Sequence, residues 1–179
     1  MNLYIMRHGL TRMNKEGLFN GQVDEDISEE GVNEAKATIE EVKKLDLDII
    51  YCSPLTRTKH TCNIVNVNNI QVIYDDRLKE RTLGILDGES KNTHGFSSKE
   101  YFDYNYKFGD ENKNAEDLPT FFGRVHDFLN ELKQKDYKNV LIVTHGGVLR
   151  AVYYYFNEIP EDGRISHYFN NCEIDKYEL

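Results

Sequence analysis

Two arginines, two histidines and one glutamate stand at or shortly after the ends of short apolar runs in the sequence. They are Arg7, His8, Arg57, Glu80 and His145. A neutral imidazole can attack phosphorus and form a phosphohistidine, while a nearby carboxylic acid can protonate the departing oxygen. Arginine guanidinium groups present planar forks that match phosphate oxygens. If the fold brings these side chains together, they supply a phosphoryl-transfer site that requires no metal.

Each of these residues also has a plain structural interpretation. A histidine beside a strand is more often a hydrogen-bonded turn residue, and Arg57 fits a solvated position on a helix. Glu80 fits an ion pair with Lys79 or Arg81. The remaining histidines follow no expected strand and are interpreted as structural or surface residues: His60, His94, His126 and His167. The functional interpretation therefore depends on whether separate elements deliver the five side chains to one place.

Several short apolar segments with β-branched residues predict the strands that would position these groups. The segments are 3–6, 49–52 and 140–144, with a weaker strand at 71–74 and an edge strand at 172–177. Arg7 and His8 follow the first, Ser53 and Pro54 the second, and His145 the third of these. In an open α/β sheet ligands bind beyond the carboxyl ends of the strands, so these positions share one rim.

Segments with helical periodicity lie between the expected strands. Ser28 is a suitable N-cap for a helix that runs to about Lys44, and Pro54 suits the first turn of a second helix that continues through Ile64. Apolar residues at steps of three and four predict a third helix over 118–132. A fourth follows Gly147, with an apolar face that reaches Phe156.

Alternating strands and helices imply crossover connections and a mainly parallel sheet. The expected fold class is a three-layer α/β/α sandwich, formed by a single domain over residues 1–179. Residues 87–117 show no regular periodicity and are dense in aromatic and charged residues. This segment is interpreted as a small insertion over one edge of the sheet, in the position of a lid.

Charge and composition limit the classes of partner. The chain has 22 basic and 31 acidic residues, a formal net charge of −9, which argues against a broad electrostatic surface for nucleic acid or acidic lipid. No apolar run approaches the roughly 20 residues of a membrane span, and the N-terminus lacks a secretory signal. Three cysteines without CxxC spacing fit a reducing compartment, so a cytoplasmic location is expected. The oligomeric state stays open.

Five ordered motifs resemble those of the histidine phosphatase superfamily, which has the phosphoglycerate mutase-like fold. They are RHGLTRMN from residue 7, NGQVDEDISEEG from residue 20, SPLTRTKHT from residue 53, LKERTLGILDGE from residue 78 and VTHGGVLR from residue 143. The resemblance extends from Met1 to about Tyr155. It implies that the chain shares the fold and the phosphoryl chemistry of the family.

The resemblance also implies a role for each matching residue. His8 matches the nucleophile that becomes phosphorylated, Glu80 the general acid and His145 the second histidine, which stabilises the transferring group. The positions that match substrate contacts are Arg7, Asn14, Arg57, a backbone amide at Gly146, and Asn20 and Gly21 beside the organic part of the substrate. Two positions depart from the family pattern. Leu10 stands where many members have Glu or Gln, and Ala115 to Asp117 replace a common Gly-Glu-Ser.

A metal-independent phosphomonoesterase that hydrolyses small phosphate esters through a phosphohistidine is the expected function, with no cofactor. Three alternatives remain. A phosphoglycerate mutase is less favoured because the stretch from Glu80 to His145 is short and acidic or aromatic. A metallohydrolase would use His8, Glu80 and His145 as metal ligands. A protein that binds a phosphate ligand without turnover would have no need of a proton donor such as Glu80.

Overall fold

A five-stranded sheet forms the centre of the molecule, in the spatial order β3-β2-β4-β1-β5. The computed structural model describes residues 1–90 and 95–179. The strands are β1 (Asn2–Arg7), β2 (Ile49–Cys52), β3 (Val72–Tyr74), β4 (Asn139–Thr144) and β5 (Ile174–Glu178). The strands β1 to β4 run parallel to one another, and β5 pairs with β1 in the antiparallel direction. The expected strands and the mainly parallel sheet are therefore confirmed.

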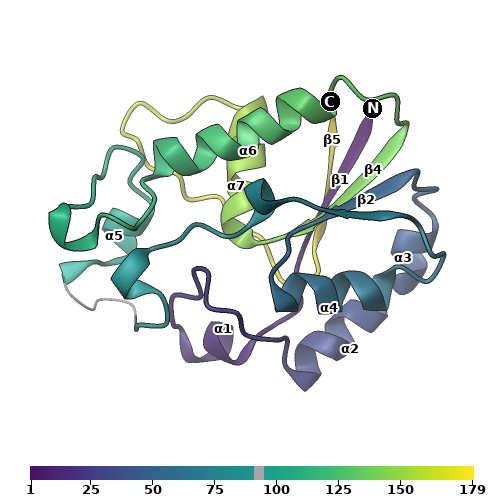
Figure 1. Ribbon diagram of the computed structural model, residues 1–179, viewed down its shortest axis with the longest axis horizontal. Helices are drawn as coiled ribbons and strands as arrows, with labels where there is room; N and C mark the ends of the chain where they lie inside the picture. The colour runs from purple at the N-terminus through teal and green to yellow at the C-terminus, as the bar shows by residue number, and fades with distance from the viewer. Residues whose placement is uncertain (91–94) are drawn as a thin grey trace.

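Helices cover both faces of this sheet (Figure 1). On one face lie α2 (Glu29–Ala37), α3 (Ile39–Lys43) and α4 (Thr56–Val65), and on the other α6 (Leu118–Leu132) and α7 (Gly146–Phe156). The short helices α1 (Arg12–Glu16) and α5 (Ser98–Tyr101) lie beyond one end of the strands. Short 3₁₀ turns lie at 76–78, 84–86 and 110–112. The fold class is the expected three-layer sandwich.

Two separate apolar clusters join the helices to the sheet, because alternate residues of each strand point to opposite faces. Ile5 and Ile142 pack with the apolar face of α6, including Leu129, on one side. Met6 and Val143 pack with residues of α2, α3 and α4 on the other. Because both clusters are buried, the carboxyl ends of β1 and β4 are held in fixed register, with Arg7 opposite Thr144.

The expected single helix over residues 28–44 is instead two helices that meet at Thr38. Ser28 caps the first as predicted, accepting a hydrogen bond from the Gly31 amide. The Thr38 hydroxyl donates to the Ala35 carbonyl at 2.9 Å, and the Thr38 amide contacts that carbonyl too. A threonine side chain that competes for a backbone acceptor in this way interrupts the regular ladder, so the helix breaks there.

The short helices α1 and α5 were not predicted, although each begins with a recognisable capping box. Thr11 and Asn14 exchange side chain to backbone hydrogen bonds at the start of α1, and Ser97 and Glu100 do so at the start of α5. The two helices have five and four residues, too short for a hydrophobic repeat to be visible. These helices matter because of where they lie: together with the ends of the strands, they form one end of the molecule.

Most aromatic residues in the described part of the 87–117 segment pack in a separate aromatic cluster, while Phe102 and Tyr104 pack against the main core. Phe19, Leu83, Leu86 and Phe96 are the buried members of the aromatic cluster, with three partly buried aromatic residues of the segment against them. Residues 91–94, which include His94, lie outside the described residues. Tyr101, which packs in this cluster, and Phe102, which packs against the main core, also line a pocket, so aromatic residues of this segment serve both packing and the wall of that pocket.

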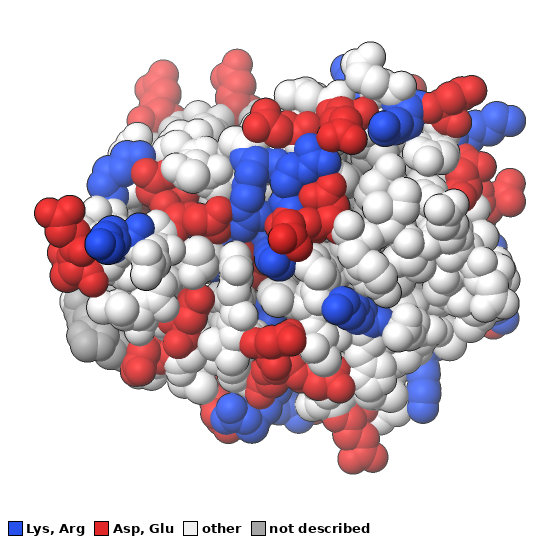
Figure 2. Space-filling model, viewed as in Figure 1, with Lys and Arg blue, Asp and Glu red and all other residues white. Residues whose placement is uncertain are grey.

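Within the two described ranges, no helix is long and apolar enough to cross a membrane. All three cysteines are buried free thiols, as expected for Cys52. On the face shown in Figure 2, acidic side chains are spread widely, and lysines and arginines lie among them. Many of these form ion pairs, such as Arg77 with Asp75 and Arg124 with Glu116.

Candidate active site

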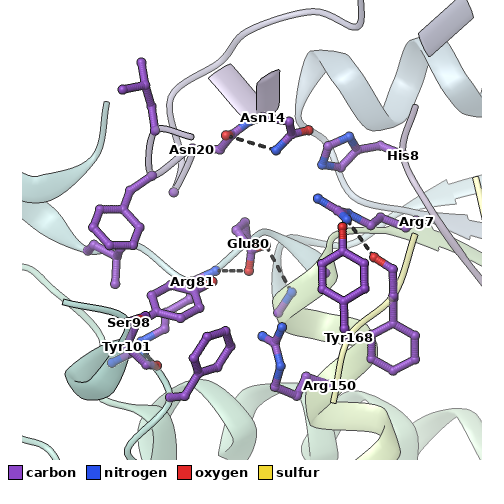
Figure 3. Close-up of a pocket in the computed structure, with 18 residues that line it drawn as sticks. Arg7, His8, Asn14, Asn20, Glu80, Arg81, Ser98, Tyr101, Arg150 and Tyr168 are labelled. Carbon is purple, nitrogen blue, oxygen red and sulfur yellow. Dashed lines mark hydrogen bonds between the residues drawn. The ribbon is translucent and has the colours of Figure 1, made fainter. Parts of the chain in front are cut away.

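A pocket that is partly open to solvent lies at the carboxyl ends of β1 and β4. Figure 3 shows the residues that line it. Most of the predicted site residues are among them: Arg7, His8, Asn14, Asn20, Gly21, Glu80 and Gly146. Arg57 and His145 are fully buried behind this lining. The structure thus brings all nine predicted residues to one end of the sheet, in two layers.

His8 is held in one tautomer by its own loop. Its Nδ1 lies 2.8 Å from the Gly9 carbonyl, which only accepts, so Nδ1 carries the proton and Nε2 keeps its lone pair. The His8 amide donates to the Thr144 carbonyl at the end of β4. The side chain is only 3% exposed yet lines the pocket. An unprotonated Nε2 facing a pocket is the arrangement that a nucleophilic imidazole needs.

Arg7 offers the pocket a buried donor. Its Nη1 donates to the Phe169 carbonyl at 2.7 Å, which fixes the guanidinium. Its Nε is buried and has no hydrogen-bond partner among the described residues. Gly146 lies beside it, since a Cβ at that position would be 3.4 Å from Nε. A phosphate oxygen is the kind of acceptor that satisfies such a donor.

Arg57 and His145 form a hydrogen-bonded layer behind the pocket. Arg57 Nε donates to His145 Nδ1 at 3.2 Å, so His145 Nε2 carries the proton and donates to Ser53 Oγ at 2.7 Å. Arg57 also donates to the carbonyls of Val23 and Gly21. The two rings of His8 and His145 have centroids 5.2 Å apart. Both His145 nitrogens are therefore engaged, and its ring lies next to the candidate nucleophile.

Glu80 is fixed by two backbone amides. Its Oε1 accepts from the Arg81 amide at 2.8 Å and its Oε2 from the Gly147 amide at 3.1 Å. Gly147 permits this approach, because a Cβ there would be 2.1 Å from Oε1. The carboxyl group is thus oriented in the pocket by the start of α7, where it can exchange a proton with a bound molecule.

Asn14 and Asn20 are joined by a hydrogen bond of 3.2 Å, which links α1 to the loop that follows it. Gly21 comes next, with φ +45°, and a Cβ there would be 1.7 Å from Asp87 Oδ1. No other residue type fits this position without rearrangement. Since Arg57 holds the Gly21 carbonyl, the buried arginine also positions the wall that carries both asparagines.

The loop after His8 packs against α2 at a close contact between glycines. A Cβ on Gly9 would be 2.5 Å from the Gly31 carbonyl oxygen, and a Cβ on Gly31 would be 2.3 Å from the Leu10 carbonyl oxygen. The Gly9 amide donates to Thr61 Oγ1 of α4. Leu10, the departure from the family pattern, is absent from the pocket lining within the described residues, and its amide donates to Glu34.

Burial sets the protonation of both central histidines. It lowers the pKa of His8 well below 6.5, with the charges of Arg57 and Arg7 adding to the effect. Burial, then Arg57 and His8, lowers the pKa of His145 in the same direction. Both rings are therefore neutral at neutral pH, as the hydrogen bonds require.

A loss of stability below pH 6.5 is expected from these two histidines. In the unfolded chain an imidazole titrates near 6.5, so below this value the unfolded state binds protons that the folded state excludes. The free energy of unfolding should fall by up to about 1.4 kcal/mol per pH unit for each ring as pH decreases from 6.5 towards the folded-state pKa values. Urea denaturation between pH 7.5 and 5.5 measures this. His8→Gln should reduce the slope, because it removes one of the two buried imidazoles.

Two charged residues of the pocket lining, Arg81 and Arg150, were not predicted from the sequence. The sequence indicates Arg81 only as an ion-pair partner for Glu80, and in the structure its side chain is 2% exposed. Arg150 is the only charged residue of α7, and it is buried there between Leu149 and Ala151. A single charge within an otherwise uncharged helix was the available signal. The structure describes three other histidines, His60, His126 and His167, and none of them lines the pocket.

No three histidine, cysteine, aspartate or glutamate side chains form a possible metal-binding group in residues 1–90 and 95–179. The set His8, Glu80 and His145 was the candidate for such a site. His145 would have to give up its bonds to Arg57 and Ser53 to coordinate an ion.

A family model for the histidine phosphatase superfamily (branch 1) matches residues 3–179. The chain belongs to the histidine phosphatase superfamily. Among curated relatives of this histidine phosphatase, a metal-independent phosphoserine phosphatase of Arabidopsis thaliana is 30% identical, with 91% of this chain and 71% of the relative covered. A 2,3-bisphosphoglycerate-dependent phosphoglycerate mutase of Lachnoclostridium phytofermentans is 32% identical, over 90% of this chain and 80% of the relative.

The fold of this histidine phosphatase also matches solved structures. The alpha-ribazole phosphatase of Shigella flexneri superposes with a TM-score of 0.86 at 23% identity, covering 100% of this chain and 91% of the other. The predicted family and fold are confirmed, and with them the class of enzyme, a phosphoric monoester hydrolase. Relatives with mutase activity belong to the same family.

Proposed function

We propose that this histidine phosphatase hydrolyses small phosphate monoesters through a phosphohistidine on His8, without a metal ion. The observation that carries the proposal is the Nδ1–H bond from His8 to the Gly9 carbonyl, which leaves Nε2 unprotonated at the pocket. Burial keeps the ring neutral, as its lowered pKa indicates. The imidazole is therefore ready to attack without first losing a proton.

In the first step, His8 Nε2 attacks phosphorus and the bond from phosphorus to the ester oxygen breaks. Glu80, in its acid form, donates a proton to the departing oxygen, so the product leaves as an alcohol. Arg7 and Arg57 balance the charge of the transferring group, with Asn14 as a further donor and Gly146 as a backbone contact. His145 supports this step by fixing Arg57 and by lying beside His8.

In the second step, water attacks the phosphohistidine. Glu80, now a carboxylate, accepts a proton from the water, the bond from phosphorus to Nε2 breaks, and inorganic phosphate leaves. His8 returns to its neutral form and Glu80 to its acid form. Asn20 and Gly21 lie along the wall where the organic part of the ester would bind.

Transfer of the phosphoryl group to a second hydroxyl, as in a mutase, would use the same phosphohistidine. The similarity to a phosphoglycerate mutase favours this as the second candidate. Hydrolysis is preferred because the segment between Glu80 and His145 is short and because the pocket stays partly open to solvent, which gives water access to the intermediate.

Phosphate release from a panel of esters, measured in excess EDTA and beside a mutase assay with 2,3-bisphosphoglycerate, tests this function. We expect release from at least one ester at a rate that EDTA leaves unchanged within about twofold, since no step uses a metal. Mutase product without net phosphate release would select the second candidate. Loss of activity in EDTA that zinc restores would favour the metallohydrolase, and no turnover of any ester, with phosphate binding retained, would identify a binding protein.

A further inference from the structure

The segment that carries Glu80 is neither helix nor strand. Residues 79–83 lie between the 3₁₀ turns at 76–78 and 84–86, and all of them are buried or half-buried. Backbone carbonyls in such a place need hydrogen-bond donors from another part of the fold. The position of the proposed acid therefore depends on the groups that supply these donors.

Arg124 of α6 supplies donors to three successive parts of this region. Its Nη1 donates to the Arg77 carbonyl at 2.7 Å and to the Lys79 carbonyl at 2.9 Å, and its Nη2 donates to the Glu80 carbonyl at 3.1 Å. The N–H groups of a guanidinium lie in one plane and point in fixed directions. One side chain from a distant helix thus holds the backbone on the approach to Glu80 and at Glu80 itself.

The Glu116 carboxylate fixes Arg124 from the other side. Arg124 Nε donates to Oε1 at 2.6 Å and Nη2 donates to Oε2 at 2.8 Å, which makes a bidentate pair. Together with the three carbonyl bonds, these bonds use all five N–H groups of the guanidinium. The two side chains are 20% and 18% exposed. A half-buried and fully bonded pair of this kind is more rigid than a surface ion pair.

Glu116 also bonds directly to the part of the segment that follows Glu80. Its Oε2 accepts from the Thr82 amide at 3.2 Å, and its own amide donates to the Thr82 carbonyl at 2.9 Å. Its carbonyl accepts from Arg81 Nε at 2.7 Å. The pair of Glu116 and Arg124 therefore holds the backbone on both sides of Glu80.

The Glu80 carboxyl group lies between this segment and the start of α7. It accepts from the Arg81 amide of the segment and from the Gly147 amide of α7, and Figure 3 shows both bonds as dashed lines. Proton transfer requires the acid to lie within about 2.6–3.2 Å of the oxygen that it protonates. A displacement of the segment by about 1 Å would take the acid out of this range, and such displacements can cost about 100-fold in rate.

We propose that Arg124, fixed by Glu116, is a positioning residue for proton transfer, because it holds the Glu80 segment where the carboxyl group reaches the departing oxygen. Within the described residues, neither Arg124 nor Glu116 lines the pocket, so both act through Glu80 and not on the substrate. The inference rests on the proposed function, in which Glu80 is the acid. It adds to that function the group that keeps the acid in place.

Arg124→Lys tests the proposal, because lysine keeps the charge but lacks the planar set of five donors. Assayed with alkyl, phenyl and p-nitrophenyl phosphates, the variant should lose about 10- to 100-fold in kcat for the alkyl esters and less than about threefold for p-nitrophenyl phosphate. KM should change by less than about threefold, since Arg7 and Arg57 are unchanged. The dependence of kcat on the pKa of the leaving alcohol should therefore be steeper than in the wild type.

Glu116→Gln is the milder variant, since it removes one of the two charge-assisted bonds to Arg124. It should lower kcat for alkyl phosphates by about 3- to 10-fold with the same dependence on the leaving group. This variant tests the proposal even if Arg124→Lys does not fold. Glu131→Gln is the matched control: Glu131 lies on the same helix and pairs with Arg77 Nη1 at 2.9 Å, and its loss should change neither the rate nor the slope.

A double variant separates positioning from a general loss of structure. If Arg124 acts only through the acid, Arg124→Lys combined with Glu80→Gln should hydrolyse alkyl phosphates within about threefold of the rate of Glu80→Gln alone. Independent structural damage would instead multiply the two losses.

A fall of similar size for every ester would overturn the proposal, as would multiplied losses in the double variant or a wild-type rate and slope in both Arg124→Lys and Glu116→Gln. These results leave the proposed function standing if Glu80→Gln by itself gives the steeper slope. A wild-type slope in Glu80→Gln, or a wild-type protein that releases phosphate from none of the esters, would instead contradict the proposed function.

Discussion

His8→Ala is expected to lower kcat for phosphate release by about 10⁴-fold or more, since it removes the atom that forms the covalent intermediate. The wild-type protein, mixed with labelled ester and quenched in alkali, should retain label as a phosphohistidine, which is stable under those conditions. His8→Ala should retain none. Because Arg7 and Arg57 are unchanged, the variant should still bind inorganic phosphate, which calorimetry can measure.

His60→Gln is the matched control for this experiment. His60 lies on α4, is partly exposed and pairs with Asp26. It should keep both the rate and the label. A His8→Ala protein that turns over within tenfold of the wild type would rule out His8 as the nucleophile. Label retained in that variant would place the phosphoryl group on another residue.

Glu80→Gln should reduce kcat by about 10²- to 10⁴-fold for alkyl phosphates, and by much less for p-nitrophenyl phosphate. Alkoxides are poor leaving groups and need the proton that Glu80 supplies, whereas p-nitrophenolate leaves without one. Rates for a series of esters, plotted against the pKa of the leaving alcohol, should therefore give a steeper dependence in the variant than in the wild type.

The dependence on the leaving group separates proton transfer from a structural effect. Glutamine cannot accept from both the Arg81 and Gly147 amides, so Glu80→Gln also weakens one local hydrogen bond. A structural defect of this kind would lower the rate for all esters by a similar factor and would contradict the assignment. Glu89→Gln, at an exposed position nearby in sequence, serves as the control and should leave both slope and rate unchanged.

The sequence predicted the parts of the site that follow from strand ends. Arg7, His8 and Glu80 were selected because each follows an apolar segment, and parallel strands bring such positions to one rim whatever their side chains. The apolar periodicity of residues 118–132 likewise predicted the whole of α6. In both cases the burial of apolar side chains stabilises the element and also produces the sequence pattern that identifies it.

What the sequence could not predict depends on side-chain hydrogen bonds and on helix rotation. The position of Arg57 and His145 behind the pocket follows from bonds among Arg57, His145 and Ser53, which come from three different elements. The break at Thr38 follows from one hydroxyl bonding one carbonyl. Arg150 reaches the pocket because of the rotation of α7 about its own axis against the sheet. Apolar periodicity predicts this rotation only to within about one residue.

The contact of Gly9 with Gly31 limits how this chain can vary in evolution. A larger residue at either position forces apart the backbone segments that carry His8 and begin α2, and no residue smaller than glycine exists to compensate at the other. A substitution at one of these two glycines therefore cannot be compensated by a substitution at the other. The start of α2, which contributes no residue to the pocket lining within the described ranges, is consequently limited by the same contact as the loop beside His8.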